Sequence, residues 1–180
     1  MKALILAGGE ATRLRPLADA TNKILVKIGA KTILERTVDP LLESGVNDFV
    51  FLVGRLDNQV KDFVKKNYPP IKAVYVSDPP KRDPKGRYID TMWEARKAVQ
   101  EDDIIFTHGD IFCHPSLIRK IVEFSYSGAL VQKNFVPQKD FKARVEKGLI
   151  TKIGVDVFGK NTSFCLPVYK FLKDDFKLWM

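Results

Sequence analysis

The sequence predicts an α/β fold with a largely parallel central sheet. Apolar runs of strand length alternate with amphipathic stretches of helix length, which is the pattern of successive βαβ units. Residues 4–6 and 49–53 are apolar at every position rather than at every second one, as expected for strands covered on both faces. A chain of 180 residues with 45% hydrophobic content can bury a well-developed core, so we expect a single domain over residues 1–180.

The first part of the chain alternates strands and helices. We expect strands at 2–7, 48–53 and 71–76 and helices at 32–44 and 58–67. Pro40 falls inside the first of these helices. Because proline lacks the amide hydrogen that a helix interior uses, we expect a kink or a break there.

The second part of the chain mixes helices with shorter segments. Prolines, a glycine and mixed charges indicate a loop at 77–88, followed by a helix at 88–100, with Trp93 in the core, and a strand at 102–110. A further helix is expected at 114–126, with Pro115 near its first turn. The alternating segments 128–136, 142–156 and 163–169 then indicate antiparallel strands or a hairpin.

The last residues, 170–180, begin an amphipathic pattern. Its expected apolar side consists of Phe171, Leu172, Phe176, Leu178 and Trp179. No capping residue or helix breaker closes this pattern, which leaves open that the chain is truncated at its C-terminus.

The composition favours anionic partners without choosing among them. The chain has 30 Lys and Arg against 22 Asp and Glu, a net charge of +8. The lysines are scattered and interleaved with acids, so solvated helix faces explain them better than a nucleic-acid-binding stripe. The first residues lack the layout of a signal peptide and the length of a spanning helix, and Cys113 and Cys165 show no paired spacing. We expect a cytoplasmic protein without a membrane span, a disulfide or a nucleic-acid partner; the sequence does not predict the oligomeric state.

A glycine turn next to clustered cations is the most informative local feature. In "LILAGGEATRLRPLADATNKIL", residues 4–25, a buried strand stops at Gly8 and Gly9, and the cations Arg13, Arg15 and Lys23 follow. Glycines let the backbone amides approach an anion closely, and such turns form anion-binding concavities. The Arg13 guanidinium and the Lys23 ammonium suit phosphate oxygens, so we expect a polyphosphate ligand and assign Arg15 to the surface.

Other ligand motifs fit the sequence less well. The dinucleotide-binding pattern G-x-G-x-x-G is absent. Gly154, Gly159 and Lys160 approximate a P-loop, but Asn161 stands where Ser or Thr should bind magnesium, and the residues that follow are of extended type. The spacing of His108, Cys113 and His114 fits no zinc pattern, so we expect structural roles for them.

The glycine turn resembles the signature of the sugar-phosphate nucleotidylyltransferases, L-A-G-G-x-G-T-R-L-x-P-L-T followed by P-K-P-L. The matching positions are Leu6, Ala7, Gly8, Gly9, Thr12, Arg13, Leu14, Pro16, Leu17, Lys23 and Leu25. Ala11 replaces the third glycine, and Asn22 and Ile24 replace the prolines on either side of the lysine. "FTHGDIF" at 106–112 is similar to the metal-binding turn of that family, whereas similarity beyond Gly128 is weak. The resemblance implies a three-layer Rossmann-like nucleotidyltransferase fold with a mostly parallel, mixed sheet.

The resemblance also implies an activity and a set of site residues. Such enzymes join a nucleoside triphosphate to a phosphate monoester and release pyrophosphate. Arg13, Lys23 and Asp110 would be catalytic, with Arg13 on the departing pyrophosphate, Lys23 between the α-phosphate and the acceptor, and Asp110 on Mg²⁺. The nucleotide-binding set would comprise Leu6, Ala7, Gly8, Gly9, Glu10, Ala11, Thr12, Arg13, Lys23 and Gly109.

The acceptor region favours one branch of the family. Hexose-phosphate members carry a Gln-x-x-Pro-x-Gly-Thr-Ala-like segment, whereas residues 78–95 here depart from it and look more like the cytidylyltransferases for inositol phosphate or phosphocholine. We therefore expect CTP and one of these acceptors, with Asp78, Asp90 and Thr91 as candidates for contacts with the base or the acceptor. The alternatives are a hexose-1-phosphate enzyme using dTTP, UTP or GTP, and a non-catalytic nucleotide-sugar-binding or regulatory relative.

Overall fold

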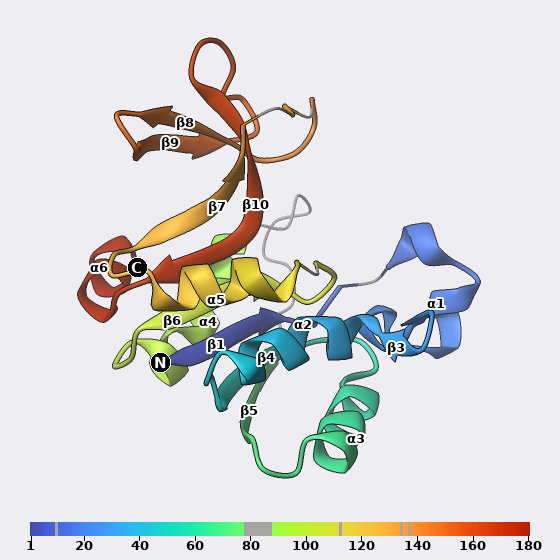
Figure 1. Ribbon diagram of the computed structural model, residues 1–180. Helices are drawn as coiled ribbons and strands as arrows, with labels where there is room; N and C mark the ends of the chain where they lie inside the picture. Colours follow the sequence, from blue (N-terminus) through green and yellow to red (C-terminus); the bar gives the residue numbers. More distant parts are fainter. Residues whose placement is uncertain (10, 78–87, 112, 134, 137) are drawn as a thin grey trace.

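A mixed sheet of eight strands forms the centre of the molecule (Figure 1). The computed structural model describes residues 1–180 except 10, 78–87, 112, 134 and 137, and the side chains of 88, 89 and 91. The strand order is β5-β4-β1-β6-β10-β8-β9, with β7 also paired to β10. The first four strands of this order run parallel, and all pairings that involve β10 are antiparallel. The predicted mostly parallel, mixed sheet is therefore confirmed.

The elements follow one another in the predicted alternation. The strands of the main sheet are β1 Lys2–Leu6, β4 Asp48–Val53, β5 Lys72–Ser77, β6 Ile104–His108, β7 Gly128–Gln132, β8 Lys142–Glu146, β9 Leu149–Gly154 and β10 Thr162–Phe171. The helices are α1 Leu17–Ala20, α2 Ile33–Glu43, α3 Asp57–Asn67, α4 Tyr88–Val99, α5 Pro115–Glu123 and α6 Lys173–Trp179. Two short 3-10 turns, η1 Thr12–Leu14 and η2 Lys23–Leu25, and a small ribbon of β2 Lys27–Ile28 and β3 Lys31–Thr32 complete the order.

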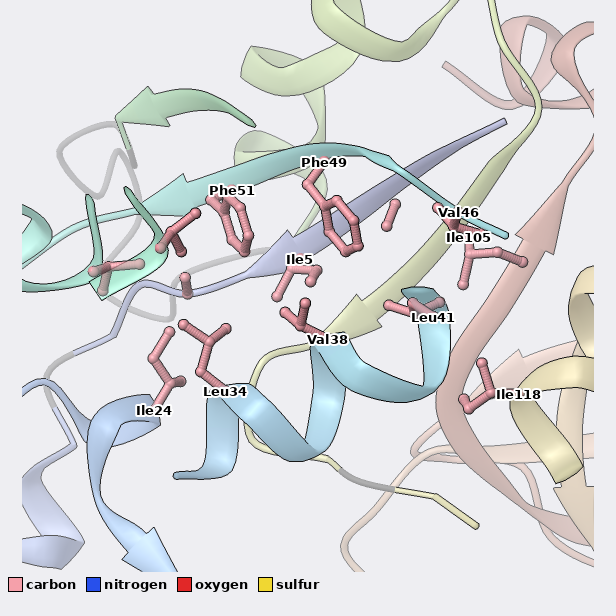
Figure 2. Packing of buried hydrophobic residues seen from close by; sticks show 14 of the residues in the cluster. Ile5, Ile24, Leu34, Val38, Leu41, Val46, Phe49, Phe51, Ile105 and Ile118 are labelled. Carbon is pink, nitrogen blue, oxygen red and sulfur yellow. The ribbon is translucent and has the colours of Figure 1, made fainter. Parts of the chain in front are cut away.

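Helices cover both faces of the sheet and make three layers. On one face, α2, α3 and α5 pack against a buried cluster that includes Ile5, Val38, Phe51, Val60 and Ile118 (Figure 2). On the other face, α4 and α6 pack against a second cluster, represented by Leu4, Leu52, Met92, Ile104 and Phe176. Alternate residues of β1 and β4 enter the two clusters, which is why these strands are apolar at successive positions.

Helix α2 begins with a capping box and continues through its proline. The Thr32 hydroxyl accepts a hydrogen bond from the Glu35 amide, and the Glu35 carboxylate accepts one from the Thr32 amide. Of the two outcomes expected at Pro40, a kink or a break, the break is wrong, because the helix runs on to Glu43. Proline removes a single intrahelical donor, and the Pro40 carbonyl still accepts hydrogen bonds from the Ser44 amide and hydroxyl.

The antiparallel part of the sheet is organised by β10. This strand pairs with β6 at its C-terminal end, with β8 at its N-terminal end and with β7 between Phe164 and Lys170. The register shifts between Cys165 and Tyr169. Pro167 lies in this stretch and has no amide hydrogen to donate to a neighbouring strand. Strands β8 and β9 form the predicted hairpin.

Several predictions for the helices need correction. Trp93 does not lie in the core: its side chain is 43% exposed, and the Arg96 guanidinium lies 3.6 Å from its ring centroid.

The last helix starts at Lys173, so Phe171 belongs to β10 and Leu172 precedes the helix. Phe176 is fully buried as expected, but Leu178 is 89% exposed. The predicted loop at 77–88 lies almost wholly outside the described residues. Within the described part of the chain, no helix is long and apolar enough to cross a membrane.

Candidate functional site

The carboxyl ends of β1 and β6 meet at one edge of the parallel sheet. Leu6 is in register with both Leu52 of β4 and His108 of β6. The residues that follow these strands, Ala7 to Gly9 on one side and Gly109 and Asp110 on the other, therefore leave the sheet at the same edge. In open α/β sheets this edge is the usual place for a ligand.

Gly109 lies against the last residue of β1. Its amide donates a hydrogen bond of 2.8 Å to the Leu6 carbonyl. A Cβ atom at position 109 would lie 2.5 Å from the Leu6 oxygen and 3.2 Å from the Ile24 side chain. Only glycine fits this close approach, which fixes the position of the next residue, Asp110.

Lys23 and Asp110 form the charged pair of the site. The Lys23 Nζ atom lies 2.7 Å from the Asp110 Oδ2 atom, and the two side chains are 21% and 42% exposed. Lys23 is carried by the η2 turn, and an added Cβ at Gly9 would lie 3.9 Å from its Nζ atom. The glycine turn, the lysine and the aspartate, separated widely in sequence, thus converge on one spot.

The environment keeps Asp110 ionised. Partial burial would raise the pKa of this carboxyl, but the hydrogen bond and charge of Lys23, aided by His108, more than offset burial and lower the pKa overall. The pKa of the neighbouring His108 is also lowered, mainly because the ring is buried. At neutral pH the site therefore contains a carboxylate and a neutral imidazole beside the Lys23 side chain.

The loop after β1 adopts conformations that favour glycine. Gly9 has φ +110°, and Ala11 has φ 49° and ψ 37°, the left-handed helical region. Ala11 is the residue that replaces the third glycine of the family signature, and its conformation here is one that glycine adopts more readily than alanine. Glu10 lies outside the described residues. Thr12 and Arg13 follow in η1, with both side chains exposed.

The two arginines of this loop differ in their surroundings. Arg15 is exposed, as predicted, and its Nε atom lies 3.3 Å from the Asp19 Oδ1 atom. Among the described residues, none forms an ion pair with the Arg13 guanidinium. Arg13 is therefore the cation of the loop whose charge is not balanced within the described structure.

Two of the remaining candidates lie in α4. Asp90 is half-buried in the first turn of that helix, and Thr91 follows it. Helix α4 covers the face of the sheet opposite α2, so these two positions lie on another element than Lys23 does. Asp78 falls outside the described residues.

Sequence reasoning missed three residues that support Lys23. Asn22, Arg55 and Gln59 form a hydrogen-bonded group linking the segment before Lys23 to the start of α3. Arg55 and Gln59 lie in no recognisable motif. The one sequence signal for this group was at position 22, where Asn22 replaces the proline of the family signature. That signal gave no indication of Arg55 or Gln59.

Asp110 has the chemistry of a magnesium ligand. A hard carboxylate at a strand end suits Mg²⁺, which proteins commonly hold through one or two carboxylates together with the phosphates of a substrate. Within the described residues no group of three or more His, Cys, Asp or Glu side chains is placed to hold a metal. The described residues therefore fit a metal that shares Asp110 with a polyphosphate, and not an all-protein metal cage.

The P-loop alternative fails, because a P-loop leads into a helix, whereas Gly159 and Lys160 lead into strand β10.

Fold and site together define an α/β protein in which a glycine turn, a lysine and an aspartate meet at the carboxyl ends of β1 and β6. A family model described as "Nucleotidyl transferase" matches residues 2–144. The chain belongs to the nucleotidyl transferase family, and the resemblance seen in its glycine turn is confirmed.

Individual relatives extend this result. A choline-phosphate cytidylyltransferase of Streptococcus pneumoniae is 44% identical over 68 residues, which cover 38% of this chain and 29% of that protein. A bifunctional IPC transferase and DIPP synthase of Aquifex aeolicus is 28% identical over 158 residues, which cover 84% of this chain and 35% of that protein. These alignments thus span about a third of each relative's length.

A solved structure confirms the fold class. The inositol-1-phosphate CTP transferase from T. maritima superposes with a TM-score of 0.77 at 18% identity, covering 98% of this chain and 72% of that one. The predicted three-layer Rossmann-like nucleotidyltransferase fold is therefore confirmed.

Proposed function

We propose that this chain transfers a nucleotidyl group from a nucleoside triphosphate to a phosphate monoester and releases pyrophosphate. The observation that carries the proposal is the convergence of Gly9, Lys23 and Asp110 at the carboxyl ends of β1 and β6. This arrangement combines a glycine turn, a cation and an ionised carboxylate, which are the groups that a metal-bound triphosphate requires.

The reaction needs alignment and charge neutralisation more than a protein nucleophile. An oxygen of the acceptor phosphate attacks the α-phosphorus, a new P–O bond forms, and the bond from the α-phosphorus to the bridging oxygen breaks. The electron pair leaves with pyrophosphate. We assign Lys23 to the α-phosphate and the acceptor phosphate, where its ammonium group offsets their mutual repulsion, and Arg13 to the departing pyrophosphate.

Mg²⁺ is the proposed cofactor, held by Asp110 together with phosphate oxygens. When bound, it neutralises charge on the triphosphate. In the structure the Asp110 carboxylate is paired with Lys23 at 2.7 Å. This pair holds both groups at the site and keeps the carboxylate ionised before a ligand arrives.

The glycine turn is the proposed cradle of the triphosphate. Backbone groups of Leu6, Ala7, Gly8 and Gly9 would hold the base and ribose, and the amides of residues 10–12 would wrap the phosphates. The left-handed conformation at Ala11 supports this assignment, since backbone amides next to such a residue can form an anion-binding concavity. Asp90 and Thr91 remain candidates for the base or the acceptor.

We favour CTP as the nucleotide and inositol 1-phosphate or phosphocholine as the acceptor. The support comes from residues 78–95, which depart from the hexose-phosphate pattern, and from relatives named for choline phosphate and inositol 1-phosphate. The alternative is a hexose 1-phosphate paired with dTTP, UTP or GTP.

The test is a pyrophosphate-release screen with Mg²⁺. Four nucleoside triphosphates are crossed with inositol 1-phosphate, phosphocholine and hexose 1-phosphates. We expect release above background in at least one combination, with CTP and an alcohol phosphate giving the highest rate. Binding of a nucleotide without release in any combination would instead support a non-catalytic relative, for which the alanine at position 11 is the motivating observation.

A further inference from the structure

The segment that carries Lys23 is held by side chains from a different element. Residues 18–20 end α1, residues 21 and 22 link that helix to η2, and the carbonyls of residues 18–20 accept hydrogen bonds from side chains at the start of α3. The Arg55 guanidinium donates to the Ala18 carbonyl at 2.6 Å and also to the Asp19 carbonyl. The Gln59 side-chain amide donates to the Ala20 carbonyl at 2.8 Å. Three consecutive carbonyls are thus bound by two side chains.

Asn22 connects this arrangement to Lys23. Its amide N–H donates to the Gln59 Oε1 atom at 2.8 Å, and its side-chain Nδ2 donates to the Arg55 carbonyl at 3.0 Å. Its Oδ1 atom accepts from the Ile24 amide at 3.2 Å, which caps the η2 turn. Asn22 is only 4% exposed; its bond with the Ile24 amide is buried, and its bonds with Gln59 and the Arg55 carbonyl are partly buried.

We infer that Asn22, Arg55 and Gln59 are positioning residues that set the location of the Lys23 ammonium group. The inference rests on the proposed function, in which Lys23 acts on the reacting phosphates. The three residues would not touch the substrate. They fix the turn from which Lys23 reaches Asp110, and a displaced cation loses much of its effect on a transition state.

The backbone at position 22 explains how this arrangement replaces a proline. Asn22 has φ −59° and ψ 134°, values that proline itself adopts. Thr21 before it has φ −125° and ψ 133°, the extended conformation required of a residue that precedes proline. Side-chain hydrogen bonds therefore hold Asn22 in a conformation that a pyrrolidine ring would impose covalently.

Asn22, Arg55 and Gln59 together are called the clamp. The first test removes the two clamp side chains that lie nearer the surface, those of Arg55 and Gln59. We expect Arg55→Ala and Gln59→Ala each to lower kcat about 10-fold, with the KM for the nucleotide changed by less than about 3-fold. Arg119→Ala, which removes an exposed arginine from α5, is the matched control and should leave kcat unchanged. Unchanged kcat in both clamp variants would overturn the inference.

The second test uses rescue at position 22. Asn22→Ala loses both the side-chain bonds and the conformational restriction, and we expect a decrease in kcat of about 10-fold or more. Asn22→Ser also loses the side-chain amide, but it keeps the backbone N–H that donates to Gln59 and a hydroxyl that can accept from the Ile24 amide, so it should recover kcat to within about 3-fold of the wild type. Equal losses in the two variants would contradict the proposal.

Hydrogen exchange does not depend on activity, so it distinguishes a failure of this inference from a failure of the proposed function. Hydrogen exchange of residues 18–25 should be faster in Arg55→Ala and Gln59→Ala than in the wild type and in Arg119→Ala. If the wild type shows no transfer in the nucleotide screen, the proposed function fails, while the exchange experiment still tests the clamp. Unaltered exchange in both clamp variants would show that Arg55 and Gln59 do not hold this segment.

Discussion

The parallel and antiparallel parts of the sheet differ most in how they bury their strands. In β4, at the centre of the parallel part, every residue from Phe49 to Val53 is buried. In β9, at the edge of the antiparallel part, no residue is buried, and Leu149 is 71% exposed. One sheet thus joins a strand covered on both faces to a strand covered on neither.

This difference indicates where a precise site can be built. The ends of β1 and β6 are fixed by strands packed between two clusters, so the residues after them leave the sheet in one defined geometry. The family match ends at residue 144, within β8, and it includes the whole parallel part. None of the residues assigned to the candidate site lies in the outer hairpin of β8 and β9.

The largest expected effect is a loss of stability in the parallel part. Phe51 is fully buried and stacks between Phe49 and Tyr75, with ring centroids 5.9 and 5.6 Å away. Phe51→Ala should lower the free energy of unfolding by about 3–5 kcal/mol. Leu149→Ala in β9 should change it by less than about 0.5 kcal/mol. Urea unfolding of both variants measures the contrast, and similar losses would show that the two parts of the sheet are equally important for stability.

The next effect concerns the charge at the site. Lys23→Ala should lower the rate of nucleotidyl transfer about 10² to 10³-fold, as removal of other preorganised transition-state donors does. Lys27→Ala, four positions further along in the exposed strand β2, is the matched control and should retain the wild-type rate. Steady-state pyrophosphate release measures both variants. A near-normal rate for Lys23→Ala would remove Lys23 from the catalytic set.

A smaller effect is expected at Ala11. Its left-handed conformation costs an alanine about 1–2 kcal/mol, whereas glycine adopts it freely but loses about 0.5–1 kcal/mol more in chain entropy. Ala11→Gly should therefore stabilise the protein by up to about 1 kcal/mol. Ala30→Gly, at a residue without a positive φ, should destabilise it slightly. Thermal unfolding of the two variants should show shifts of opposite sign, and a destabilised Ala11→Gly variant would contradict the structure of the loop.

The smallest effect is a pH dependence that arises from Asp110. Its folded pKa is lowered below 3.8, so it contributes stability above that value, and the contribution disappears as the pH falls through the lower, folded pKa. Because the pair with Lys23 is partly exposed, we expect a contribution below about 1 kcal/mol. The difference in unfolding free energy between wild type and Asp110→Asn should change in this direction between about pH 5 and pH 3. A difference independent of pH would contradict the lowered pKa.

The sequence predicted the parallel part well because its signals are local. Continuous apolar runs identified β1 and β4, and the amphipathic pattern predicted a helix from residue 32, next to the start of α2. The glycine turn indicated a candidate site, and the structure brings Lys23 and Asp110 of that candidate set together across 87 positions of sequence. The antiparallel region was predicted only as short strands, since the pairing of β10 with three partners depends on contacts distant in sequence.

Other features depend on tertiary contacts that no local pattern encodes. Trp93 belongs to a residue type that is usually well buried, yet it lies on the exposed side of α4 beneath Arg96. Arg55 looks like an ordinary surface cation until its guanidinium is seen at the carbonyls of Ala18 and Asp19. The need for glycine at position 109 also becomes visible only when β1 and β6 lie side by side.

The most direct test of the central claim is amide mapping of nucleotide binding by NMR. Each of the four nucleoside triphosphates is titrated into the isotope-labelled protein in the presence of Mg²⁺. We predict that at least one nucleotide shifts the amide resonances of Gly8, Gly9 and Gly109, while those of β8 and β9 remain unchanged. Shifts confined to β8 and β9, or no shift with any of the four nucleotides, would contradict a triphosphate site at the carboxyl ends of β1 and β6.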